Sequence, residues 1–134
     1  MIQKLLAHPE PLTGLDISFD STMIVTSAYD GYVRLWDLHR GMCIKTLVAE
    51  TGGTSAVSSV KLTPNSKYIY IANMNGKCGL YDLKGTLIKA YEGHTNTEYP
   101  LELCTPYLSN LRGGRSILMT GSEDGRLVGW DINS

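Results

Sequence analysis

The sequence predicts an all-β fold made of three repeated four-stranded antiparallel sheets. Three aromatic–Asp pairs recur 45 and then 49 residues apart, at Trp36-Asp37, Tyr81-Asp82 and Trp130-Asp131. A turn dipeptide stands six residues before each aromatic, at Asp30-Gly31, Asn75-Gly76 and Asp124-Gly125. Asp-Gly and Asn-Gly favour two-residue hairpin turns that need positive φ. Their recurrence in phase indicates one unit used three times.

Each turn is flanked by short segments in which apolar residues alternate with period two, as in half-buried strands. In the first repeat we expect strands at 12–18, 23–28, 32–37 and 42–48. In the second we expect 56–62, 67–73, 78–82 and 86–91, and in the third 98–105, 116–121 and 127–132. Helix is not expected, because Gly, Pro, Asn and Asp interrupt the chain too often.

A further strand is expected at the N-terminus. Segment 2–6 has the character of a repeat's last strand, and His8 opens the next repeat. The expected strands then number one before the first repeat, four in each of the first two repeats and three in the third. Together they are enough for three four-stranded sheets. Segment 2–6 either completes the last sheet or belongs to a neighbouring one.

Composition excludes several function classes. The 134 residues carry a net charge of −1, which leaves no electrostatic footprint for nucleic acid. No apolar stretch approaches the length of a membrane span. Cys43, Cys78 and Cys104 form no C-x-x-C pair, so we interpret them as free thiols in a reducing compartment, the nucleus or the cytoplasm. No catalytic or phosphate-binding motif is present, and we expect no enzyme, cofactor or metal site.

A period near 45 residues, the Trp-Asp dipeptide and an upstream Ala-His or Gly-His resemble the WD40 repeat family. The resemblance implies a partial β-propeller over 1–134, with blades near 7–49, 50–92 and 93–134. Six strings are similar, in order, to the middle blades of the WD40 scaffold subunit of COMPASS- and trithorax-type histone lysine methyltransferase complexes: 7–12, 26–31, 34–37, 42–47, 63–69 and 93–99. Insertions near 51–54 and 108–115 differ from that pattern.

The resemblance implies a buried hydrogen-bond relay in which a loop His bonds the turn Asp and a Thr, whose hydroxyl meets the indole of Trp. By motif position the relay residues are His8, Thr26, Asp30 and Trp36 in repeat one, and His94, Thr120, Asp124 and Trp130 in repeat three. Such a set stabilises because each buried polar group finds a partner. A catalytic triad is the alternative interpretation. Repeat two has Ile71, Asn75 and Tyr81 at these positions and is expected to depend on packing.

The resemblance also implies a central channel that grips an arginine side chain of a partner peptide or histone tail, between aromatic rings. The matching peptide-binding positions are Glu10, Thr13, Tyr29, Ser58 and Tyr99. One stacking aromatic of the family falls on Glu102, which removes half of the stack or replaces it with a salt bridge. Alternatively, Tyr29 and Tyr99 are ordinary loop tyrosines.

A second surface implied by the resemblance binds another subunit through Asn65, Tyr68, Cys78 and Asn133, although Tyr68 also suits simple sheet packing. We therefore expect a nuclear, non-catalytic scaffold with protein partners, including a histone tail and methyltransferase subunits. The alternative is an adaptor of another complex, in ubiquitin ligation, RNA processing or trafficking.

Three blades leave two sheet faces uncovered. The chain is then a fragment, half of an oligomeric ring or a truncated paralogue, and we expect it to self-associate.

Overall fold

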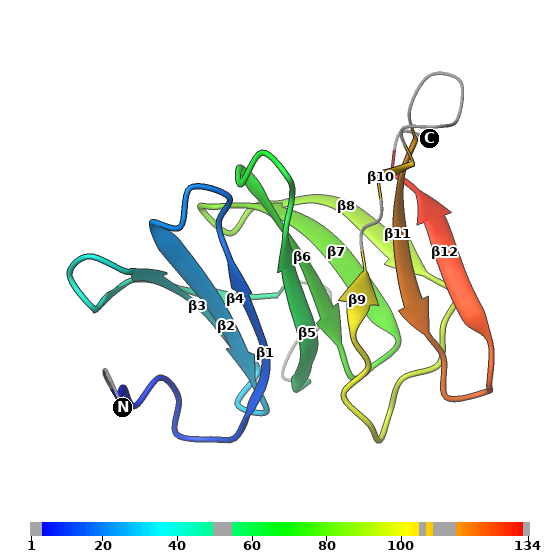
Figure 1. Ribbon diagram of the computed structural model, residues 1–134. Coiled ribbons are helices and arrows are strands. Elements are labelled where there is room, and N and C mark those ends of the chain that lie inside the picture. The colour runs from blue at the N-terminus through cyan, green and yellow to red at the C-terminus, as the bar shows by residue number, and fades with distance from the viewer. Residues whose placement is uncertain (1–3, 50–54, 105–106, 109–114, 133–134) are drawn as a thin grey trace.

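The computed structural model describes residues 4–49, 55–104, 107–108 and 115–132. All regular elements in these ranges are strands, so they contain no helix that could cross a membrane. The strands form three antiparallel sheets that fan out side by side, with the inner strands β1, β5 and β9 on the near side of Figure 1. The predicted all-β, bladed fold is confirmed.

Sheets 1 and 2 each contain four strands in sequence order. Sheet 1 consists of β1 (Leu12–Ile17), β2 (Met23–Ala28), β3 (Tyr32–Asp37) and β4 (Met42–Val48). Sheet 2 consists of β5 (Val57–Leu62), β6 (Tyr68–Asn73), β7 (Lys77–Asp82) and β8 (Leu87–Glu92). Every strand expected in these two repeats is present, with ends within one residue of the expected ones.

Sheet 3 departs from the expectation on its inner side. It consists of β9 (Leu103–Cys104), β10 (Tyr107–Leu108), β11 (Arg115–Gly121) and β12 (Leu127–Asp131). Both β9 and β10 pair with β11 along one edge, so together they take the place of a single inner strand. The expected strand over 98–105 is wrong in its first half, because the backbone N–H groups of residues 97–99 bond the Glu123 carboxylate instead of a neighbouring strand.

The turn dipeptides occupy different turn positions from those expected. Gly31, Gly76 and Gly125 have positive φ, at 83°, 77° and 85°, but their partners Asp30, Asn75 and Asp124 do not. In the first turn Gly31 N–H donates to Ala28 O, so Asp30 and Gly31 are its third and fourth residues. The two-residue turn was therefore a wrong prediction. Asp30, Asn75 and Asp124 instead each accept the backbone N–H two residues further on, which shapes the turn.

The sheets pack front to back. We call the face that carries Trp36, Tyr81 or Trp130 the front of its sheet, and the opposite face the back. The back of sheet 1 (Val25, Val33, Leu35, Leu47) packs on the front of sheet 2 (Val60, Ile69, Ile71, Tyr81) in one core cluster. The back of sheet 2 (Tyr70, Ala72, Cys78, Tyr91) packs on the front of sheet 3 (Leu103, Leu118, Trp130) in a second. The front of sheet 1 and the back of sheet 3 have no such neighbour among the described residues.

The expected N-terminal strand does not form in the described residues. Lys4–Leu6 pair with no strand, although segment 2–6 was expected to complete the last blade or a neighbouring one. Residues 4–6, at the blue end of the ribbon, and β12 lie at opposite sides of the molecule (Figure 1), so residues 4–6 do not reach the last sheet of their own chain. A strand needs a partner for its backbone N–H and C=O groups, and none lies beside it.

Candidate functional site

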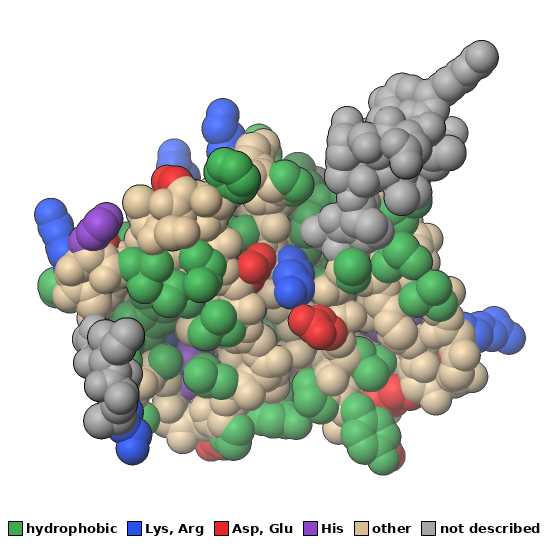
Figure 2. Space-filling model, in the orientation of Figure 1, with side chains coloured by type: hydrophobic (Ala, Val, Ile, Leu, Met, Phe, Trp, Pro, Cys, Tyr) green, Lys and Arg blue, Asp and Glu red, His purple; other side chains and the backbone are tan. Residues whose placement is uncertain are grey.

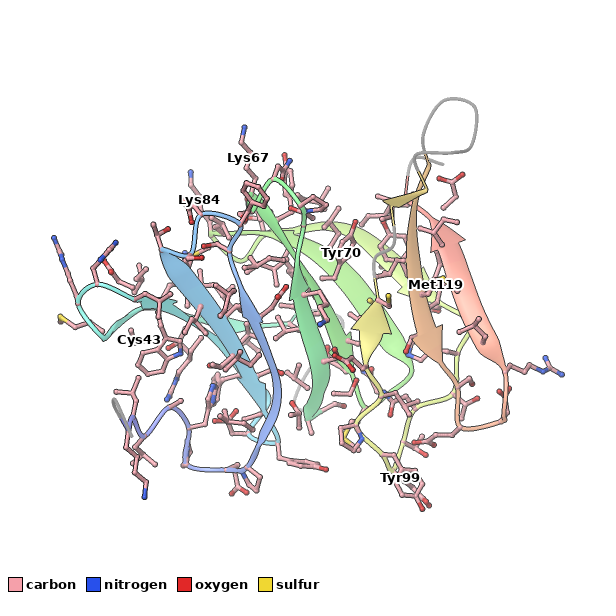
Figure 3. The ribbon with its side chains drawn as sticks, in the orientation of Figure 1. Cys43, Lys67, Tyr70, Lys84, Tyr99 and Met119 are labelled. Atoms are coloured by element: carbon pink, nitrogen blue, oxygen red, sulfur yellow. The ribbon has the colours of Figure 1, made fainter. Side chains whose placement is uncertain are left out.

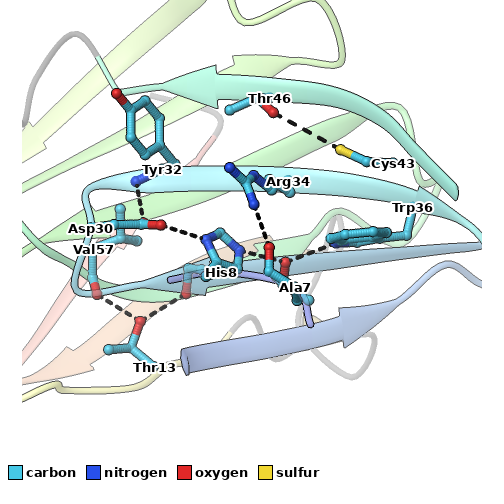
Figure 4. Close-up of polar contacts among 12 residues, drawn as sticks. Ala7, His8, Thr13, Asp30, Tyr32, Arg34, Trp36, Cys43, Thr46 and Val57 are labelled. Atoms are coloured by element: carbon cyan, nitrogen blue, oxygen red, sulfur yellow. Dashed lines mark hydrogen bonds and ion pairs between the residues drawn. The ribbon is translucent and has the colours of Figure 1, made fainter. Parts of the chain in front are cut away.

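Sheet 1 contains the expected relay, drawn in Figure 4. His8 Nδ1 lies 2.9 Å from Asp30 Oδ2, and His8 Nε2 lies 2.9 Å from the Thr26 hydroxyl. The indole N–H of Trp36 donates to that hydroxyl oxygen at 3.0 Å. Since a carboxylate only accepts, Nδ1 donates to Asp30, and in the neutral imidazole Nε2 then accepts the Thr26 O–H. Every polar atom of this chain of contacts has a partner, and the relay ends on an indole, which activates no nucleophile.

Sheet 2 differs in sequence at the relay positions. Ile71 and Tyr81 take the places of the Thr and the Trp. Both are buried in the cluster between sheets 1 and 2. Ile71 has no hydroxyl, so this position needs no buried histidine as a hydrogen-bond partner.

Sheet 3 does not form the expected relay of His94, Thr120, Asp124 and Trp130. The Trp130 indole donates to the Glu92 carbonyl at 2.9 Å, and the Thr120 hydroxyl donates to backbone carbonyls at 3.3 and 3.2 Å. Both ring nitrogens of His94 are buried without a hydrogen-bond partner among the described residues. His94 instead contacts Trp130 edge-on, with ring centroids 5.5 Å apart, and burial lowers its pKa. The prediction failed because backbone carbonyls compete for the Thr and Trp donors.

The expected peptide-binding hydroxyls lie in one groove along the inner strands. Thr13 on β1 and Ser58 on β5 line it together with Pro100 and Glu102, and its volume is about 290 Å³. Thr13 donates to Val57 O at 2.7 Å, and Ser58 donates to Leu101 O at 3.3 Å. These two bonds are repeat equivalents that tie each inner strand to the next. The hydroxyls are therefore engaged in joining the sheets, a role that no local sequence pattern indicated.

Glu102 gives the groove its charge. Its side chain is 80% exposed and pairs with Lys61 Nζ at 3.2 Å. Acidic and basic side chains lie next to each other in the middle of the face seen in Figure 2. Glu102 was expected either to remove half of the aromatic stack or to replace it with a salt bridge. The structure contains a salt bridge, and its partner is Lys61 of the same chain. A surface pair of this kind contributes only about 0–1 kcal/mol, so a cationic ligand can displace Lys61 at small cost.

The three other expected peptide-binding residues lie at one end of the sheets. Glu10 precedes β1, Tyr29 follows β2, and Tyr99 stands in the loop before β9, at the lower edge of Figure 3. All three are exposed, Tyr29 at 40% and Tyr99 at 62%. They border the same end of the inner strands but do not line the groove. The structure thus brings Thr13 and Ser58 together and leaves the tyrosines at the rim.

Glu123 positions the rim loop and was missed in the sequence. Its Oε1 accepts the backbone N–H groups of Thr97, Glu98 and Tyr99 at 3.0, 2.8 and 2.9 Å, and its Oε2 accepts the Thr97 hydroxyl at 3.0 Å. These bonds lower the pKa of Glu123 to about 2. The only available signal was a carboxylate beside the Asp124-Gly125 turn, which does not identify a partner 24 residues away.

Three of the four residues of the second expected surface lie in the described part of the chain. Asn65 lies in the turn between β5 and β6, and Tyr68 begins β6 with its side chain 37% exposed. Cys78 is fully buried between sheets 2 and 3, where burial raises its pKa to about 12, so the prediction that it contacts a partner is wrong. Asn133 lies outside the described residues. Binding through Asn65 and Tyr68 stays a prediction.

The front-to-back sheets, the aromatic–Asp turns and the His–Thr–Trp relay define a WD40 repeat protein. The WD domain, G-beta repeat family matches residues 1–37 and 41–82, more than half of the chain, and the chain belongs to this family. WD40 repeats are generally non-catalytic scaffolds for protein interactions.

Several curated relatives match this chain. COMPASS component SWD3 of Saccharomyces cerevisiae is 23% identical over 143 residues, which covers 100% of this chain and 45% of that protein. Autophagy-related protein 16 of Arabidopsis thaliana is 29% identical over 122 residues, 90% of this chain and 22% of that protein. Target of rapamycin complex subunit wat1 of Schizosaccharomyces pombe is 29% identical over 117 residues, which covers 85% of this chain and 33% of that protein. The chain spans less than half the length of each.

Proposed function

We propose that this chain is a non-catalytic scaffold whose inner-strand groove binds an arginine-bearing peptide. The observation that carries the proposal is the position of Glu102, an exposed carboxylate on the wall of a groove of about 290 Å³. A guanidinium donates through a planar fork that matches a carboxylate, whereas the ammonium of Lys61 is a single point charge. An incoming arginine can therefore make the better-fitting pair with Glu102.

The rim favours the same ligand. Tyr29 and Tyr99 are exposed at the end of the sheets from which a peptide would enter. An arginine passing an aromatic ring gains about 0.5–1 kcal/mol at exposed sites. With Thr13 and Ser58 engaged between the sheets, the peptide contacts depend on Glu102 and the rim tyrosines and not on the hydroxyls.

For the partner we propose a histone tail or another subunit of a nuclear histone methyltransferase complex. The likeness to COMPASS component SWD3 over the whole chain supports this source of arginine. The second candidate is an adaptor in a different assembly, nuclear or cytoplasmic. It is supported by higher identities to an autophagy protein and to a subunit of the target of rapamycin complex.

Calorimetric titration of the 134-residue chain with an arginine-containing histone-tail peptide tests the groove. A matched peptide with citrulline at that position should bind more weakly, because it lacks the positive charge. Glu102→Gln should weaken binding of the arginine peptide by a factor of about three to ten, as expected for one partly exposed charge-assisted hydrogen bond.

Glu92→Gln is the matched control, since Glu92 is an exposed carboxylate on the outer strand β8. Equal binding of the arginine and citrulline peptides, or equal loss in the two variants, would contradict the groove proposal. Affinity purification of the chain from nuclear extract then separates the candidates, by recovering methyltransferase subunits or a different set of proteins.

A further inference from the structure

The loop that leads into sheet 3 is docked on the neighbouring turn in a different register from its equivalent in sheet 1. In sheet 1 the residue before the turn aspartate, Tyr29, donates its N–H to Pro11 O at 3.1 Å, three residues after the relay histidine. In sheet 3 the equivalent residue, Glu123, donates its N–H to Thr95 O at 2.9 Å, one residue after His94. The sheet 3 loop is therefore docked two residues closer to its histidine.

The sheet 3 loop is also two residues longer. Leu15 on β1 stands seven positions after His8, whereas Leu103 on β9 stands nine positions after His94. These two leucines are equivalent, because each lies opposite the relay threonine of its sheet. Docking in the sheet 1 register would place Thr97 O on the turn N–H and leave six positions before Leu103, for a span that four positions cover in sheet 1. The chain is therefore long enough for both registers.

The observed register leaves the relay of sheet 3 open. His94 is 6% exposed, and neither of its ring nitrogens has a hydrogen-bond partner among the described residues. A neutral imidazole has one N–H and one lone pair, and each costs free energy when it is buried without a partner. The register in which the loop is docked therefore opposes the burial of its own histidine.

The relay partners of His94 are present in sheet 3 but make other contacts. Asp124 Oδ1 accepts the Arg126 N–H, as the turn aspartate of sheet 1 accepts the N–H two residues on. Asp124 Oδ2 lies 3.9 Å from Arg126 Nε, in an exposed ion pair of small value. The Thr120 hydroxyl donates to carbonyls at 3.3 and 3.2 Å, longer than the usual range of about 2.5–3.0 Å. These contacts are weak enough to be exchanged for the relay.

The Glu123 carboxylate stabilises the observed register. It accepts the backbone N–H groups of residues 97–99 and the Thr97 hydroxyl. Hydrogen bonds to an ionised acceptor are about twice as strong as neutral ones. Sliding the loop by two residues would bring Thr97 O onto the turn N–H and carry 97–99 away from the carboxylate. The carboxylate clamp and the relay therefore exclude each other.

We propose that Glu123 acts as a conformational switch that sets the register of the loop 94–102. In the clamped register, which the structure contains, the carboxylate holds the loop and His94 is unpaired. In the relay register the loop slides by two residues, and His94 bonds Asp124 and Thr120 as its counterpart does in sheet 1 (Figure 4). The sheet is bistable because each register satisfies polar groups that the other leaves without partners.

The register of this loop also affects the groove. Asn96 is 1% exposed, and its Nδ2 donates to Ser58 Oγ on the groove wall at 3.0 Å. Leaving the clamped register breaks this bond and moves Tyr99 at the rim. The switch thus changes two of the residues that border the groove, although it does not depend on peptide binding there.

NMR spectroscopy of the 134-residue chain tests the switch. Glu123→Ala should raise the ratio of relay to clamped molecules at least about tenfold, because charge-assisted hydrogen bonds are lost from the clamped register alone. Long-range ¹H–¹⁵N spectra should then show a hydrogen-bonded Nδ1–H on His94, like that of His8. The Trp130 indole proton should gain an NOE to the Thr120 methyl group, as the indole of sheet 1 has to its own relay threonine. The unchanged sheet 1 signals show that the variant is folded.

Matched variants separate the switch from a general loosening of the loop. Glu98→Ala removes an exposed carboxylate from the same loop and should leave the wild-type spectrum. Adding Thr120→Val to Glu123→Ala should reverse most of the gain, because the relay loses a member. Glu123→Gln should shift the ratio in the same direction by less, and it decides the question if Glu123→Ala fails to fold.

Three results would overturn the proposal. The first is a His94 spectrum that neither Glu123 variant changes. The second is a gain that Thr120→Val leaves intact or that Glu98→Ala reproduces. The third is a wild-type chain whose His94 already has the hydrogen-bonded Nδ1–H of His8.

Discussion

The Trp36 indole donates to the Thr26 hydroxyl at 3.0 Å across strands β3 and β2. The same hydroxyl lies 2.9 Å from His8 Nε2, and this second contact joins the front of sheet 1 to the segment that carries His8. The equivalent pair in sheet 3, Trp130 and Thr120, donates to backbone carbonyls instead. Two sheets of one chain with the same four motif residues therefore use them differently.

Thr26→Val should lower the free energy of unfolding by about 1–3 kcal/mol, because it leaves the buried His8 nitrogen and the indole N–H without their shared partner. Urea titration followed by tryptophan fluorescence measures the loss. Thr120→Val serves as the control and should cost less, since the Thr120 hydroxyl donates to backbone carbonyls and links no other side chain among the described residues. Equal losses would show that the sheet 1 relay adds no stability.

The neutral state of His94 should make stability depend on pH. Burial lowers the pKa of His94 below its usual 6.5, so the unfolded chain takes up the proton first. Its contribution is present above pH 6.5 and is lost as the pH falls through the lower, folded-state pKa. Wild-type protein should therefore unfold at lower urea concentration as the pH drops below 6.5.

His94→Phe should reduce that slope, because phenylalanine can keep the edge contact with Trp130 and has no proton to gain. His39→Gln is the control, since His39 is exposed and its loss should leave the slope unchanged. A slope equally steep in His94→Phe would place the titrating group elsewhere.

Glu123 should control the order of the rim loop. Its pKa of about 2 lies below the usual value of 4.5, so its support for the loop is present above pH 4.5 and disappears as the pH falls toward 2. Glu123→Gln should speed amide hydrogen exchange at residues 97–99 at neutral pH, because an amide is the weaker acceptor. Exchange at 24–26 on β2 is the internal control, and unchanged rates at 97–99 would exclude this role.

Gly14 should be required for the close approach of sheets 1 and 2. A Cβ built at Gly14 would lie 2.7 Å from Ser27 Oγ and 3.1 Å from the backbone nitrogen of Val60. Gly14→Ala should therefore lower the free energy of unfolding by about 1–3 kcal/mol, the usual cost of overpacking. At Gly121 a Cβ meets nothing within 4 Å, so Gly121→Ala should be near neutral in the same urea titration. Similar values for the two variants would contradict this tight contact.

The strands of sheets 1 and 2 could be predicted because their signals are local. Alternating apolar residues and turn glycines determine each hairpin within about fifteen residues, and Gly31 and Gly76 indeed have positive φ. The relay of sheet 1 also followed from motif positions. These features need no knowledge of how the sheets meet.

The features that failed depend on contacts distant in sequence. Ser58 meets Leu101 O 43 residues away, and Glu123 meets the loop at 97–99. Neither contact has a local signature, so the sequence predicts a peptide-binding role for Ser58 and a full strand over 98–105. Cys78 shows the same limit, because its burial depends on sheet 3 packing over the back of sheet 2.

Methyl NOE spectroscopy on the 134-residue chain tests the central claim, that successive sheets pack front to back as propeller blades. We predict NOEs from Val33 and Leu35 to Val60 and Ile71, and from Leu118 to Ala72, since each set shares one core cluster. NOEs that connect Val33 and Leu35 to Leu118, or the absence of contacts between sheets 1 and 2, would contradict it.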